Sequence, residues 1–184
     1  INMYGSDQSM LVRWKGGGET SVNPENSQWR IEAFKKAPVA TDYPVVSIYN
    51  GSTVDPIRDS KWGPLLRTTI RSGSKEGANC AGHCKVVLWG CGLGSFSMAV
   101  VDARSGRVQF PPFECVELSH NSLSLPGAQL LPAYQIGSRL IVFYGVIDKK
   151  EWVGYHYYTF DNGTFSRVHF IPDKDHSRDK AHGA

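Results

Sequence analysis

Three cysteines and one histidine stand close together in the stretch NCAGHCKVVLWGCGLGS, residues 79–95. Thiolates and imidazole nitrogens are the usual zinc ligands, and the candidate set is Cys80, His83, Cys84 and Cys91. Structural zinc sites present their ligands in pairs on separate turns. Here Cys91 follows a strand-like segment of about five residues, which would span about 16 Å. The spacing therefore disfavours a metal site, and we predict neither a metal nor another cofactor.

A nucleophilic cysteine would need a histidine beside it and a third group to orient the imidazole. Neighbouring residues in extended chain point to opposite faces, so His83 is badly placed to serve Cys84, although His120 or His156 could approach Cys91 from another strand. The histidines occur in no H-E-x-x-H motif, and the chain has no G-x-S-x-G motif or paired carboxylates. Asp102 is better explained as a turn-former than as a catalytic acid. We therefore predict that the protein is not an enzyme.

A disulfide needs only suitable geometry and an oxidising compartment. The four cysteines allow three pairings. We favour a bond between Cys91 and Cys115, on strands that flank the Asp102–Gly106 turn, with Cys80 and Cys84 closing a small ring. The first bond would contribute about 3 kcal/mol of stability. Disulfides and a first residue that is not methionine predict a periplasmic or secreted protein whose signal segment or lipid anchor was removed upstream of Ile1.

Most of the chain has the composition and alternation of β-strands. Strands are expected at 10–14, 29–37, 43–51, 85–90, 95–102, 106–110, 138–147, 152–160 and 164–170. Pro64 suits a first helical turn and predicts one short helix near 63–72. Asp102–Gly106 and Asn162-Gly163 have the chemistry of hairpin turns. These features predict an all-β fold with one or two short helices: an antiparallel meander, sandwich, barrel or propeller-like domain.

The 184 residues fit one domain, which we place at 29–172 between a flexible N-terminal arm, 1–28, and a solvated C-terminal tail, 173–184. The net charge of +3 is spread without any long basic run, so nucleic acid is not an expected partner. No apolar stretch approaches the length of a membrane-spanning helix.

The order of three motifs resembles a group of mostly uncharacterised extracytoplasmic bacterial proteins. The motifs are N-x-A-G-H at 79–83, W-G-C-G at 89–92 and V-D-x-x-S-G at 101–106. In that group aromatic residues commonly replace Cys80 and Cys84, and a second cysteine follows where this chain has Ser95. The resemblance implies a secreted or lipid-anchored β-rich domain. More distantly, the chain is similar in kind to periplasmic lysozyme inhibitors and to immunity proteins.

A binding protein needs a rigid scaffold and exposed aromatic or apolar anchors. The loop 116–137 is long for a hairpin connection and rich in leucine, which favours a binding role. We take the candidate binding residues to be His120, Leu123, Leu125 and Tyr134 from this loop, with Trp62 and Tyr155 elsewhere. The sequence thus predicts an inhibitor or immunity protein that binds a cell-wall hydrolase such as a peptidoglycan hydrolase. The alternative is an envelope hydrolase or a carbohydrate-binding accessory domain.

Overall fold

The computed structural model describes residues 2–4, 10–13, 19–22, 35–59, 62–117, 132–148 and 153–172. Near the N-terminus, β1 (Asn2–Tyr4), β2 (Met10–Arg13) and β3 (Glu19–Val22) pair as an antiparallel sheet in the order β1-β2-β3. The strand expected at 10–14 is therefore present as β2. Strands β1 and β3 on either side of it were not expected, because their segments show little apolar alternation.

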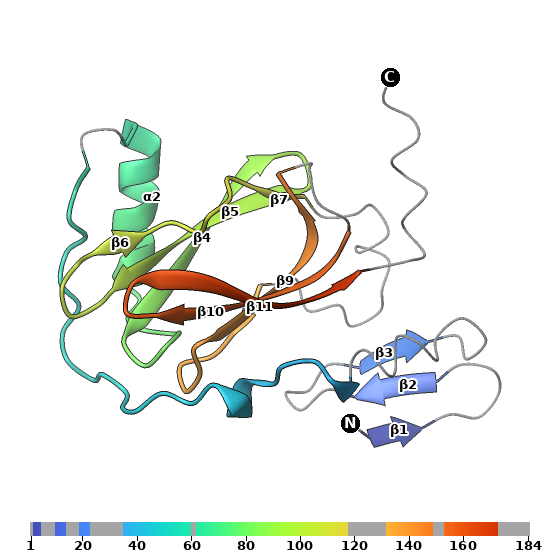
Figure 1. Ribbon diagram of the computed structural model, residues 1–184. Helices are drawn as coiled ribbons and strands as arrows, with labels where there is room; N and C mark the ends of the chain where they lie inside the picture. Colours follow the sequence, from blue (N-terminus) through green and yellow to red (C-terminus); the bar gives the residue numbers. More distant parts are fainter. Residues whose placement is uncertain are drawn as a thin grey trace.

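The rest of the fold is one open antiparallel sheet of eight strands (Figure 1). Along the main path the strands follow the order β11-β10-β9-β7-β5-β4, while β6 pairs with β5 and β8 with β9. Their bounds are β4 Cys84–Gly92, β5 Ser95–Asp102, β6 Val108–Gln109, β7 Val116–Glu117, β8 Ala133–Tyr134, β9 Leu140–Ile147, β10 Gly154–Asp161 and β11 Thr164–Pro172. The predicted all-β class is confirmed.

Local chemistry explains the two turns that we expected. Asp102 accepts a hydrogen bond from the Arg104 amide (2.8 Å), and Gly106 adopts the positive φ of 70° that a glycine tolerates best. Asn162 and Gly163 both have positive φ, 48° and 80°, as a type I′ turn between β10 and β11 requires. These turns set the register of their hairpins.

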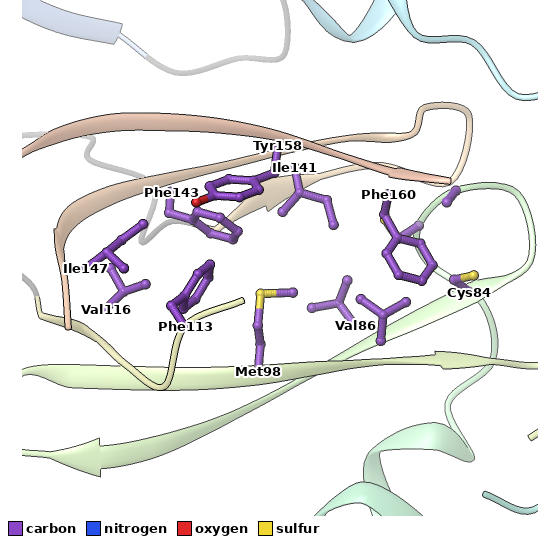
Figure 2. Packing of buried hydrophobic residues seen from close by; sticks show 13 residues of the cluster. Cys84, Val86, Met98, Phe113, Val116, Ile141, Phe143, Ile147, Tyr158 and Phe160 are labelled. Carbon is purple, nitrogen blue, oxygen red and sulfur yellow. The ribbon is translucent and has the colours of Figure 1, made fainter. Parts of the chain in front are cut away.

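The main core lies between two halves of the curled sheet. Figure 2 shows Val86, Met98 and Phe113 pointing toward Ile141, Phe143 and Tyr158 on the opposite strands. The rings of Phe113, Phe143 and Tyr158 touch one another, with centroids 5.3 to 5.8 Å apart. Such edge and tilted contacts add to the free energy gained from burying these side chains. The two halves of the sheet are thereby held together although the sheet does not close into a barrel.

The helix expected near 63–72 is present as α2 (Pro64–Ser74), with Pro64 in its first turn. It packs on the face of β4 and β5 that is turned away from the main core, where a second cluster contains Ile70, Val87, Ala99 and Val101. The alternation of β4 thus supplies two cores, because Val86 faces one and Val87 the other. Within the described parts of the chain, no helix is long and apolar enough to cross a membrane.

Two expected strands are wrong or untested. Residues 43–51 form no strand beyond an isolated bridge from Pro44 to Ser138. Their backbone hydrogen bonds to described residues are scattered and form no continuous ladder, and Val46 is fully exposed. The segment 29–37 is described only from residue 35, and its described end is not extended. The centre of the 116–137 loop and the tail 173–184 lie outside the described residues, whereas the two ends of the loop form β7 and β8.

Candidate functional site

The hairpin that joins β4 to β5 turns at one end of these two strands, near the top of Figure 1. All residues from Gly90 to Gly94 are exposed, and Leu93 at the tip is as exposed as in an isolated peptide (103%). Leu88 is 40% exposed on the strand leading to the tip. No charged residue occurs between Lys85 and Asp102. The hairpin therefore presents an uncharged apolar surface to its surroundings.

Glycines shape this tip. Gly94 has a φ of 66°, and a Cβ added there would meet no atom within 4 Å. The pairing of β4 with β5 is irregular between Gly90 and Gly92, so the strand bulges just before the turn. Leu93 stands between Gly92 and Gly94, and neither neighbour has a side chain to cover it. Its exposure thus follows from the sequence G-L-G at a hairpin tip.

A disulfide between Cys91 and Cys115 braces the hairpin, with the two Cα atoms 6.5 Å apart. This is the bond that we expected from the sequence. Cys115 immediately precedes β7, and β5 lies between β4 and β7 in the sheet order. The bond therefore joins the end of β4 to the start of a strand that is not its hydrogen-bonded neighbour.

Cys115, the partner of Cys91 in this disulfide, is held in place by Asp148. The Asp148 carboxylate accepts hydrogen bonds from the amides of Glu114 (2.8 Å) and Cys115 (3.0 Å). The Asp148 amide donates in return to the Cys115 carbonyl at 3.0 Å. Asp148 follows the last residue of β9, so Cys115 is held to the central part of the sheet. The hairpin is consequently preformed rather than loosely attached.

An aromatic cluster lies beside the base of the hairpin, on the α2 side of the sheet. Phe110 contacts Trp62 and Trp89 edge-on, with ring centroids 5.7 and 6.3 Å apart. Phe110 remains 40% exposed, and both tryptophans are half-buried. Trp62 was a candidate from the sequence, whereas Phe110 and Leu93 were missed. The glycines on both sides of Leu93 were the sequence signal for the tip, but Phe110 gave no such signal.

The second predicted disulfide, between Cys80 and Cys84, is not formed: both are free thiols. Their backbones face each other and exchange two hydrogen bonds of 2.9 Å, and both side chains lie in the main core. Burial raises the pKa of each thiol to about 12. The nearby Cys84 adds to the rise at Cys80, and the charge of Asp102 adds to it at Cys84. These thiols are neutral at physiological pH and act as small core residues.

The four residues considered as zinc ligands, Cys80, His83, Cys84 and Cys91, do not come together in the structure. Cys91 is bonded to Cys115, while Cys80 and Cys84 point into the core. Among the residues that the structure describes, no group of three or more His, Cys, Asp and Glu side chains is placed to share a metal ion. Cys80 and Cys84 pack in the core at the start of β4, and Cys91 is bonded to Cys115 near its end.

His83 lies next to Asp102, with Nε2 and Oδ2 4.0 Å apart. Asp102 also accepts a hydrogen bond from the Ser105 hydroxyl (2.9 Å) and one from the Arg104 amide, as a turn-former does. Burial lowers the pKa of His83, and the charge of Arg104 lowers it further, against the opposing effect of Asp102. Burial raises the pKa of Asp102, but its hydrogen bonds and the charges of His83 and Arg104 outweigh burial and lower it overall.

The two other described candidates, Tyr134 and Tyr155, pack on different clusters. Tyr134 is half-buried and packs on the main core, which raises the pKa of its hydroxyl. Tyr155 is half-buried against Tyr144, at a centroid distance of 4.7 Å, and packs on a third cluster around Leu140 and Tyr157. His120, Leu123 and Leu125 lie outside the described residues. Trp62 contacts Phe110, which in turn contacts Trp89 of β4.

Comparisons of the chain with protein-family models, with curated proteins and with solved structures found no match.

Proposed function

We propose that this chain is an extracytoplasmic protein-binding domain that inhibits, or gives immunity against, a cell-wall hydrolase. The observation that carries the proposal is the braced β4–β5 hairpin, whose tip residue Leu93 is fully exposed while Cys91 beside it is bonded to Cys115. An exposed apolar hairpin tip is the part of this domain that would enter the active-site cleft of an enzyme. Because the loop is preformed, little conformational entropy is lost when it binds.

The surface chemistry of the hairpin agrees with this role. A side chain that enters a cleft loses its contact with water, which is favourable for leucine and costly for a charged group. The hairpin carries no charge between Lys85 and Asp102, and Leu88 and Leu93 are its exposed apolar residues. Phe110 is exposed on the other face of the sheet, beside Trp89 and α2. Leu93 at the tip would form the apolar centre of an interface, with polar residues around it.

The disulfide supports the extracytoplasmic part of the proposal, since such bonds persist in oxidising compartments. The sequence resemblance to extracytoplasmic β-rich proteins, and the similarity in kind to lysozyme inhibitors, support the choice of a cell-wall hydrolase as the partner.

The test is an inhibition assay against a panel of purified lysozymes and other peptidoglycan hydrolases. We expect the protein to inhibit at least one of them, and Leu93→Ala to raise the inhibition constant at least about tenfold, which is about 1.4 kcal/mol. Leu65→Ala is the matched control, because Leu65 is a leucine of similar exposure (81%) located on α2. Equal effects of the two substitutions, or no inhibition by the wild-type protein, would contradict the proposal.

The aromatic cluster Trp62–Phe110–Trp89 favours a second candidate, a carbohydrate-binding accessory domain. Exposed aromatic rings can pack on the apolar faces of sugar rings. Co-sedimentation with purified peptidoglycan separates the two functions, because this candidate requires binding to the glycan without any enzyme and loss of that binding in Phe110→Ala. The inhibitor proposal requires the enzyme and depends on Leu93.

A further inference from the structure

Among the described residues, those that pair with the outer edge of β4 lie along its first half. Cys84 exchanges two backbone hydrogen bonds with Cys80, and the Val86 amide donates to Asn79 Oδ1 at 2.8 Å. Backbone groups of a strand alternate in direction with a period of two, so those of Leu88 and Gly90 point to the same outer side. Strand β4 ends the sheet, and no described residue forms a backbone hydrogen bond to Leu88 or Gly90 from that side. Both residues are exposed.

The strand at the opposite end of the sheet is different. Strand β11 carries the exposed Arg167 and ends at Pro172, and charged residues and proline are the usual protection of an edge strand against pairing with another chain. The second half of β4 has neither, and its bulge between Gly90 and Gly92 limits regular pairing to the residues before it. In the part of the chain that the structure describes, the open edge is thus Leu88–Gly90.

We propose that a second copy of this chain pairs with this edge, antiparallel and about a two-fold axis, so that the two sheets become continuous. Another extended backbone matches the alternating amides and carbonyls along such an edge. A two-fold axis brings identical residues together, so any charge near it would meet its own copy. The absence of charge between Lys85 and Asp102 removes that repulsion, and the half-exposed Leu88 would form an apolar cross-strand contact.

The pairing segment is short, and we therefore expect a weak dimer that dissociates in the micromolar range. The proposal does not depend on the inhibitor function, since it concerns the edge of β4 and requires no hydrolase.

The experiment is analytical ultracentrifugation of the full chain from about 1 to about 200 μM, a range in which weak interfaces dissociate. The key variant is Gly90→Pro, which removes the outward amide and places a ring on the edge. Gly90→Ala is its matched control: it keeps the amide, and the added Cβ would lie 3.9 Å from the Ser95 carbonyl oxygen, an ordinary contact. We expect dimers for the wild type and Gly90→Ala, and dimerisation at least about tenfold weaker for Gly90→Pro.

Leu88→Glu provides a second test if Gly90→Pro does not fold, because it places two like charges across the axis. It should also weaken the dimer at least about tenfold. Hydrogen exchange at low and high protein concentration should show added protection at Leu88 and Gly90 and none along β11. A wild-type protein that stays monomeric throughout would overturn the proposal. So would a dimer that persists unchanged in a folded Gly90→Pro or Leu88→Glu variant.

Discussion

Gly73 of α2 lies directly against Val87 of β4, and a Cβ added to Gly73 would be 2.7 Å from Val87 Cγ1. The missing side chain lets the helix approach the sheet closely enough to bury Ile70 completely. The close approach also fixes α2 over the strand that carries the braced hairpin. Four predictions follow from this contact and from the cysteines and charges around β4.

Gly73→Ala should destabilise the protein although alanine is the better helix former. The substitution gains about 1 kcal/mol of helix propensity, but overpacking against Val87 costs about 1 to 3 kcal/mol. We expect a net loss, measured as a lower urea midpoint with an unchanged m-value. Ser72→Ala at an exposed position of the same helix is the control and should not lower the midpoint. A more stable Gly73→Ala variant would mean that the helix moves away at no cost.

Removal of the disulfide should destabilise the whole domain and not only the hairpin. The bond closes a loop between positions separated by 24 residues, and the chain-entropy model gives it about 3 kcal/mol. Cys91→Ala/Cys115→Ala should lower the free energy of unfolding by about that amount in denaturant titrations. If the double variant were as stable as the wild type, the bond would be shown to serve only the local shape of the hairpin.

The cysteines should react in two classes. Cys80 and Cys84 are buried and their thiols are neutral, so iodoacetamide should modify neither in the native protein. After unfolding without a reductant we expect two modified cysteines, and after reduction four, by intact mass. Two modifications of the native protein would show that the Cys80–Cys84 region opens. None after unfolding would reveal the second disulfide that the sequence suggested.

Stability should fall on acidification. The pKa of His83 in the folded protein is below its ordinary value of 6.5, so the unfolded chain binds the proton first and stability is lost as the pH falls from about 6.5. The lowered pKa values of Asp102 and of Glu76, which is hydrogen-bonded to Lys85, act in the same direction at lower pH. His83→Asn should reduce the loss between about pH 6.5 and pH 5, measured by urea midpoints. An identical pH profile in the variant would exclude His83 as the cause.

The sequence alone determined the elements whose cause is local. The hairpin β10–β11 follows from Asn162-Gly163, the turn after β5 from Asp102 and Gly106, and the start of α2 from Pro64, because each depends on the conformations available to a few consecutive residues. The partner of Cys91 also followed from the sequence, since the turn between β5 and β6 brings Cys115 back toward the hairpin.

Only the tertiary structure decided which extended segments became strands and which apolar residues stayed exposed. Residues 43–51 have strand-like composition, but within the described chain they make only scattered backbone hydrogen bonds and one isolated bridge, at Pro44, and not the continuous ladder of a strand. Cys80 and Cys84 were equally suited to a disulfide by spacing, yet the curled sheet places both thiols in its core. Leu93 and Phe110 look like core residues in the sequence. Both are exposed because the sheet does not extend far enough to cover them. Where a sheet ends depends on strands that are distant in the sequence.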